Sequence, residues 1–500
     1  AGEQEGTLGD LSLTHELAAS DLTASGARIA SLRMEGTGRV SDNMTRSEFT
    51  ARIEGERVDL GLGDNSSLAQ ARRASEGTLA ASLLGKLERG LASALSDGTV
   101  QGDVTLRSNE DGLRVIVPEA RLRSGSGDTV LALSRVSYAS RGGRFSGNIL
   151  TGGANLPRIN GRMEQVEGGD LALRLTMAEY RAGSDALAIP RMELRQSPSG
   201  RLAFNGMVQA EGALPGGAVR GLQVPLEGSW SAGEGLAVGQ RCTDVRLASL
   251  QIYQLSLRER SVRLCPQAGS AMVRYRDALD VAMVSDNLLL EGALSDTPTR
   301  VAADRVTLRY PGPFTLTGLD AVIGAPDSAV RLTAASFDGT LGESIGGSFT
   351  GGTAAMDIVP LDLSDLSGNW SFADGALAVT EGGFTLVERT GPGPDLVQQS
   401  RFEPMTARGA SLTLIDGVIA AEAPLRRFDP GQVIANVAVR HDLSSGTGRA
   451  DIDVPGVRFV DKGFQPEDLS YLAKGVIAAA EGTVSGKGEV TWTPEGVDSS

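Results

Sequence analysis

Apolar and polar residues alternate along short stretches of this chain, which is the pattern of β-strands with one apolar face. In residues 305–310, Val306, Leu308 and Tyr310 share one side. The same alternation recurs in segments 330–332, 370–372, 377–379, 412–414 and 436–439. Asp-Gly pairs, which favour two-residue hairpin turns, occur at 111–112, 338–339, 374–375 and 416–417. We therefore predict antiparallel hairpins in which successive strands pair.

The strand pattern is almost uninterrupted, so the number of domains is the next question. Only residues 391–394, Gly-Pro-Gly-Pro, resemble a linker, and strands of the same kind flank them, which favours a loop. A series of β-sandwiches would show the same alternation. A very long sheet must instead hide its apolar face by curling. We predict a mainly β fold: one long, continuous, curled antiparallel sheet forming an open apolar groove, with one or two amphipathic helices along it.

Residues 78–97 are the stretch with helical spacing. Thr78 is the predicted N-cap, and Asp97-Gly98 is predicted to end the helix through a left-handed glycine. Gly85 and Gly90 cost about 1 kcal/mol each relative to alanine. Taken alone, the stretch favours a helix packed on an ordinary core; beside a long sheet, it predicts a helix whose leucines face the groove. These leucines are Leu79, Leu83, Leu84, Leu87, Leu91 and Leu95.

The predicted organisation follows from these patterns. Residues 1–64 form a first groove segment, 65–97 an amphipathic helical insertion, and 98–463 a continuous groove. A short helix follows over 464–480, beginning at Pro466, and residues 481–500 begin the next groove strands. We expect the chain to be the middle piece of a longer protein.

Composition narrows the class of protein. With 65 glycines, 4% aromatic residues and 41% apolar residues, the chain has many turns and enough apolar surface to fold. The net charge of −15 argues against nucleic acid as a partner. No window reaches the roughly 18 continuous apolar residues of a membrane span.

Cys242 and Cys265 are the two cysteines. Their spacing fits neither a CxxC redox pair nor a four-ligand zinc site. A disulfide formed in an oxidising compartment is the favoured interpretation, and two independent buried thiols are the alternative. In the chain-entropy model, such a loop would stabilise the fold by roughly 3 kcal/mol.

The chain lacks the sequence motifs of catalysis. There is no GxSxG, HExxH or GxxxxGK motif, and the 62 carboxylates are scattered. His15 and His441 lie far apart, and each is interpreted as a surface residue rather than a base. We therefore predict no catalytic residues, no cofactor and no metal site.

Two stretches resemble the YdbH branch of the AsmA-like proteins. The first runs from Cys242 through Leu255-Ser-Leu257 and residues 261–266 to 271–275, and the second covers residues 464–475, 482–492 and 496–500. Residues 156–175 and 214–230 also resemble this branch, so the likeness covers most of the chain after residue 100.

The resemblance implies a periplasmic protein that is anchored in the inner membrane of a Gram-negative bacterium and moves phospholipids to the outer membrane along a hydrophobic groove. Its partners would be phospholipid acyl chains, the inner membrane through an anchor outside these residues, and a docking lipoprotein at the outer membrane. The alternative is a secreted or surface β-rich structural protein or adhesin without lipid transport. From the alternation, the predicted groove lining is Val306, Leu308, Leu332, Trp370, Phe372, Leu377, Val379, Leu412, Leu414, Val437 and Val439.

Overall fold

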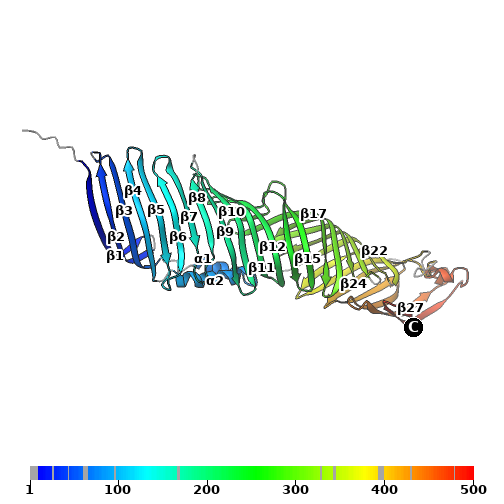
Figure 1. Cartoon of the computed structure of the whole chain (residues 1–500). Coiled ribbons are helices and arrows are strands. Elements are labelled where there is room, and N and C mark those ends of the chain that lie inside the picture. Colours follow the sequence, from blue (N-terminus) through cyan, green and yellow to red (C-terminus); the bar gives the residue numbers. More distant parts are fainter. Residues whose placement is uncertain are drawn as a thin grey trace, which may run out of the picture. The chain divides into compact units, whose positions relative to one another are not determined.

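The computed structural model describes residues 9–24, 27–42, 44–59, 66–94, 97–165, 169–326, 329–341, 345–357, 359–391, 399–427, 431–477 and 479–499. Over these residues the chain is mainly β: an antiparallel sheet of 29 strands accompanied by two α-helices (Figure 1). The predicted fold class is confirmed. The chain forms two compact units, Ala1–Ala248 and Ser249–Ser500, which are described separately below.

The first unit carries both α-helices, α1 (Ser66–Ala74) and α2 (Leu79–Ala94), between its third and fourth strands. Its strands are β1 (Leu11–Ala24), β2 (Ala27–Ser41), β3 (Arg46–Asp59), β4 (Gly98–Asn109), β5 (Gly112–Arg123), β6 (Thr129–Ala139), β7 (Arg144–Thr151), β8 (Ile159–Gln165), β9 (Leu171–Ala182), β10 (Asp185–Gln196), β11 (Leu202–Leu214), β12 (Gly217–Ser231) and β13 (Gly235–Val238). A 3₁₀ turn, η1 (Arg141–Gly143), lies between β6 and β7. Strand β14 (Thr243–Ile252) contains the boundary between the units.

The second unit contains two further 3₁₀ turns, η2 (Pro466–Asp468) and η3 (Tyr471–Ala473). Its strands are β15 (Leu255–Pro266), β16 (Val273–Tyr275), β17 (Leu279–Leu294), β18 (Thr297–Tyr310), β19 (Gly312–Ile323), β20 (Val330–Leu341), β21 (Ile345–Met356), β22 (Val359–Ala373), β23 (Ala376–Glu388), β24 (Met405–Ile415), β25 (Val418–Arg426), β26 (Val433–Asp442), β27 (Thr447–Phe459), β28 (Gly482–Thr493) and β29 (Gly496–Ser499).

Successive strands pair antiparallel within each unit, as a chain of hairpins requires. This holds from β1 to β12 and again from β17 to β29. Two predicted Asp-Gly turns are present: Asp374-Gly375 and Asp416-Gly417 each join strands as a two-residue loop, with φ between 50° and 81°. Positive φ at both positions matches the right-handed twist of the flanking strands.

The other two Asp-Gly pairs are not the loops that the sequence predicts. The loop between β4 and β5 is Glu110-Asp111, because Gly112 already pairs with Asn109. Asp338 and Gly339 lie inside β20. Gly339 is needed there for space, since a Cβ at this position would lie 2.6 Å from Cζ2 of Trp370. Gly339 is therefore needed to make room for the Trp370 side chain of another strand, and not to form a turn.

Many strands change phase near their middle, so that two consecutive residues point away from the apolar face. In β18, Ala303 is buried, Asp304 and Arg305 are exposed, and Val306 is again half-buried. Left-handed residues mark these places in many strands: Asn287, Gly318, Gly351, Asp365, Glu381 and Gly409 have φ between 53° and 78°. The apolar face thus continues across the full length of a strand although the sequence alternation shifts by one residue.

Helix α2 begins as the sequence predicts. The N–H of Ala80 donates to Oγ1 of Thr78 at 3.3 Å, which is the N-cap bond. The predicted end needs correction, because Asp97, with φ 54°, is the left-handed residue and Gly98 already belongs to β4. The predicted helix over 464–480 is also wrong, since η2 and η3 are single 3₁₀ turns.

The two glycines of α2 have different surroundings. Both are buried, but a Cβ on Gly90 would lie 2.5 Å from the carbonyl oxygen of Asn155, whereas one on Gly85 would meet the flexible Arg72 side chain at 3.3 Å. Gly90 thus permits the helix to approach the loop before β8. The low helix propensity of Gly90 is therefore accompanied by a close contact between the helix and this loop.

Alanine substitutions should separate these two roles. We expect Gly85→Ala to be neutral or to raise the free energy of unfolding by up to about 1 kcal/mol, through helix propensity and reduced freedom of the unfolded chain. Gly90→Ala should lower it by about 1–3 kcal/mol through overpacking against backbone. Urea unfolding of the two variants measures both. Equal stabilisation by both alanines would contradict the close approach at Gly90.

Candidate functional site

A row of apolar residues runs through directly opposed positions of twelve successive strands in the second unit. Each member is the cross-strand partner of the next, so all lie on one face of the sheet. In order from β17 to β28 they are Met283, Leu308, Phe314, Gly339, Gly347, Trp370, Val379, Leu412, Ala421, Val439, Ala450 and Val490. We call the face that carries this row the inner face of the unit.

The neighbouring row, one residue along each strand, is polar. From β18 to β23 its members are Thr307, Thr315, Asp338, Ser348, Asn369 and Thr380. Since successive side chains point to opposite faces, this row lies on the outer face. The two faces of the sheet are therefore chemically distinct across these strands.

The first unit repeats this arrangement with different residues. Its apolar row, from β1 to β12, is Leu17, Met34, Ile53, Gly102, Ala120, Leu133, Ile149, Gly161, Leu175, Met192, Gly206 and Leu226. We call this the inner face of the first unit. Neither apolar row contains a charged residue, so each is a continuous apolar track.

The predicted lining residues of the second unit lie on this inner face. Leu308, Trp370, Val379, Leu412 and Val439 belong to the row itself. Two positions along the same strands, and therefore on the same face, are Val306, Phe372, Leu377, Leu414 and Val437.

Leu332 reaches the inner face by a different route. It lies opposite Ala321 and Ala354, five positions before Phe337, and Ala335-Ser336 mark the phase change of β20 between them. Leu332 is 36% exposed. Strict alternation would place Leu332 and Phe337 on opposite faces, whereas the phase change brings both inward.

Large side chains of the inner face cover glycines of other strands. Trp370 covers Gly339, stacks on Phe337 with ring centroids 4.8 Å apart, and donates its Nε1–H to the carbonyl oxygen of Asp338 at 3.0 Å. Trp492 over Gly448, Phe49 over Gly38 and Phe204 over Gly228 repeat the contact. Trp492, Phe49 and Phe204 each cover a glycine on the adjacent strand, whereas Trp370 reaches Gly339 across β21. In each pair the glycine leaves room for the bulky side chain.

His441 lies on the same inner face, and the prediction that it is a surface residue is wrong. Its side chain is 1% exposed, and Nε1–H of Trp492 donates to its Nδ1 at 3.1 Å. Burial lowers the pKa of His441 below its ordinary value of 6.5, against smaller opposing effects of Thr447 and Asp442. The neutral imidazole thus completes the apolar face. His15, which is half-buried beside Phe49, is not a simple surface residue either.

Helix α2 lies across the inner face of the first unit near one end of the strands. Leu79 and Leu83 pack with Met177, Tyr180 and Ile159, and Leu83 is buried. At the other end of the helix, Leu91 and Ala94 pack with side chains of several strands, namely Ile29, Val58, Val100, Leu122, Val130 and Leu131. Leu84 and Leu87 are half-buried, and Leu95 lies outside the described residues. The helix therefore borders the apolar track along one margin.

Polar contacts fix α2 in this position. Nζ of Lys86 donates to the carbonyl oxygen of Arg181 at 2.7 Å and lies 4.9 Å from the centre of the Tyr180 ring. The Tyr180 hydroxyl donates to the carbonyl oxygen of Asn155 at 2.8 Å. Arg72 of α1 pairs with Glu88 of α2 at 3.0 Å. The apolar packing is thus supplemented by bonds to both neighbouring helix and sheet.

One buried charged group at the margin of the inner face is neutralised by an ion pair. The Glu388 carboxylate, at the end of β23, has no accessible side-chain surface and accepts from Nε and the backbone N–H of Arg401 at 2.6 and 2.5 Å. Among the described residues, no group of three or more His, Cys, Asp and Glu side chains could hold a metal ion. The row residues of the inner face thus offer apolar contact area.

Cys242 and Cys265 are disulfide-bonded. The crosslink closes the segment that contains β14 and most of β15. In a search restricted to the described residues, no helix is long and apolar enough to span a membrane.

The buried histidine generates a test of pH dependence. Since the pKa of His441 is lower in the folded than in the unfolded chain, its contribution to stability is complete above about pH 6.5 and is lost as the pH falls below that value. We expect the melting temperature of the wild type to drop more between about pH 7.5 and pH 5 than that of His441→Gln. Thermal unfolding at both pH values measures the difference; equal drops would contradict a neutral, buried His441.

Comparison with known proteins identifies a family. The family model YdbH-like, described as intermembrane phospholipid transport protein YdbH, matches residues 3–500. No curated protein and no solved structure matches the chain.

Proposed function

Because this chain belongs to the YdbH-like family of intermembrane phospholipid transport proteins, we propose that it is a bridge-like conduit along which phospholipids move between the inner and outer membranes. Acyl chains would lie on the inner face, and headgroups would project into water at its open side. The proposed activity is transport and requires no catalytic residue. A periplasmic location suits a chain that contains a disulfide.

The unbroken apolar row is the observation that carries this proposal. An acyl chain gains about 0.8 kcal/mol for each methylene removed from water, wherever apolar side chains supply the contact. In the row from Met283 to Val490 every strand supplies such a contact, so a lipid moving from strand to strand finds similar surroundings. Little sequence specificity is needed, and this agrees with the variety of residues in the two rows.

The absence of charge from both rows supports the same proposal. A charged side chain without a partner on a poorly hydrated floor would cost several kcal/mol when an acyl chain covers it. The outer face, by contrast, carries ion pairs such as Arg305–Asp286 and Arg331–Asp357 at 3.0 and 3.1 Å. These ion pairs thus lie on the face that water keeps solvated.

Anchoring and docking complete the proposal. We expect an anchor in the inner membrane and a docking lipoprotein at the outer membrane, both on the strength of family membership alone. Helix α2, with Leu79, Leu83 and Leu91 against the sheet, would form one wall of the conduit in the first unit.

Site-specific photocrosslinking in cells tests the proposal. A photoreactive residue at Leu412 or Phe372 should form phospholipid adducts, because both side chains lie on the inner face. Thr413 and Ser371, their neighbours on the outer face, are matched controls and should give few adducts. Lipid extraction and mass spectrometry identify the adducts. Equal labelling at inner and outer positions, or none at either, would contradict the conduit and favour a β-rich structural protein.

A further inference from the structure

Two arginines oppose each other on the outer face of the first unit. Arg162 of β8 and Arg174 of β9 are direct cross-strand partners, and both are exposed. Like charges in this position destabilise a sheet, because their Cβ atoms are only about 5 Å apart. An anion lying between the two guanidinium groups would remove the repulsion.

The side chains around this pair neutralise it only in part. Nε of Arg174 lies 3.9 Å from Oε1 of Glu193, beyond hydrogen-bond distance. Other opposed arginine pairs have a closer acid: Arg107, opposite Arg114, pairs with Glu48 at 3.0 Å, and Arg449, opposite Arg440, pairs with Asp451 at 2.9 Å. The positive charge of Arg162 and Arg174 is therefore less well compensated by neighbouring carboxylates than that of the other two arginine pairs.

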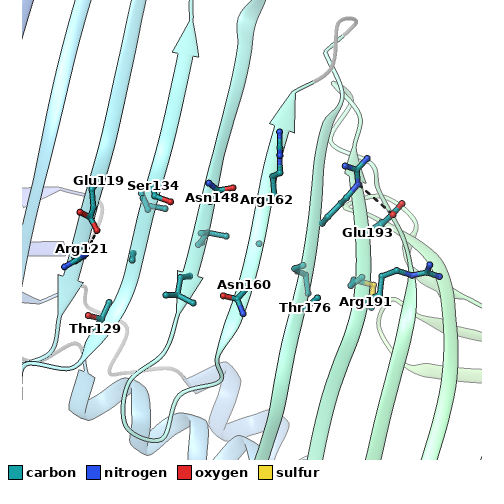
Figure 2. Close-up of a pocket in the computed structure, with 18 residues that line it drawn as sticks. Glu119, Arg121, Thr129, Ser134, Asn148, Asn160, Arg162, Thr176, Arg191 and Glu193 are labelled. Atoms are coloured by element: carbon teal, nitrogen blue, oxygen red, sulfur yellow. Dashed lines mark ion pairs between the residues drawn. The ribbon is translucent and has the colours of Figure 1, made fainter.

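The pair lines a shallow depression of about 800 Å³ across β5–β10 (Figure 2). Four arginines line it, Arg121, Arg162, Arg174 and Arg191, against two glutamates, Glu119 and Glu193. The depression is thus positively charged in a chain whose net charge is −15. Glu119 pairs with Arg121, which leaves Arg162 and Arg191 without an acid of their own in the lining.

Neutral hydrogen-bond donors lie beside the arginines. Asn160 and Thr176 are direct cross-strand partners two positions from Arg162 and Arg174, and both are exposed to the same depression. An amide and a hydroxyl next to guanidinium groups are the donors that an oxyanion with several oxygens requires. A planar guanidinium also matches phosphate geometry through two parallel bonds.

We propose that this depression binds a phosphate group, which Arg162 and Arg174 clamp and Arg191, Asn160 and Thr176 help to hold. The phosphate belongs either to a soluble phosphate compound or to a phospholipid headgroup at a membrane surface. By register, these five side chains lie on the outer face. Leu133, Ile149, Gly161, Leu175 and Met192 of the apolar row also line the depression, but their side chains point to the inner face. The site therefore goes beyond the proposed transport. If the depression binds no phosphate, the photocrosslinking test of the conduit at Leu412 is unaffected.

Calorimetric titration of the purified chain with inorganic phosphate and with pyrophosphate tests the site, at an ionic strength kept constant with chloride. We expect saturable binding that weakens about tenfold or more in Arg162→Gln and in Arg191→Gln, since each variant removes charge-assisted bonds. Arg195→Gln is the matched control: it removes one exposed arginine of the same strand β10 outside the depression and should change affinity less than about twofold.

Flotation with phosphatidylglycerol or phosphatidylcholine vesicles distinguishes the two sources of phosphate. Retention on phosphatidylglycerol that Arg162→Gln abolishes and Arg195→Gln preserves would assign a headgroup. Binding of the soluble phosphates without retention would assign a soluble ligand. No saturable binding to any probe, or equal weakening in all three variants, would overturn the proposal. Melting curves of the variants show whether each remains folded.

Discussion

Cross-strand register is the constraint on which the rest of this structure depends. Each apolar row exists only because every strand is paired in the one alignment that brings its apolar residues to the same face. A slip of one residue would exchange the faces of a strand and place polar side chains in the row. The positive-φ residues within strands adjust this alignment locally, so that the inner face is maintained over strands longer than ten residues. The register thus determines both the packing and the proposed path of the lipid.

Much of the fold follows from local pattern. Alternation within 305–310 or 412–414 already indicates which residues share a face, and short turns between such segments indicate hairpins. The phase changes do not follow from alternation, because they depend on single left-handed residues such as Asp365 and Glu381. Nothing in the local sequence marks these residues as left-handed. Leu332 faces inward although strict alternation from Phe337 would point it outward. Asp338-Gly339 matches the sequence pattern of a turn but lies inside strand β20.

The inner face also depends on contacts between strands that no local pattern reveals. Trp370 was recognisable as an apolar residue, but its position over Gly339 depends on the alignment of β20, β21 and β22. His441 is polar in isolation and becomes part of an apolar face only because Trp492 covers it and bonds to it. Gly90 likewise has low helix propensity, and only its close approach to Asn155 explains why a glycine is needed there.

The central claim is that the inner face of each unit is continuous for lipid, and a matched pair of charge substitutions in the second unit tests it most directly. The measurement is the amount of phospholipid that copurifies with the folded protein, determined by mass spectrometry for wild type, Leu412→Arg and Thr413→Arg. The account predicts that Thr413→Arg carries as much lipid as wild type, whereas Leu412→Arg remains folded and carries much less. Equal lipid in all three proteins, or unfolding of Leu412→Arg as in a closed core, would contradict it.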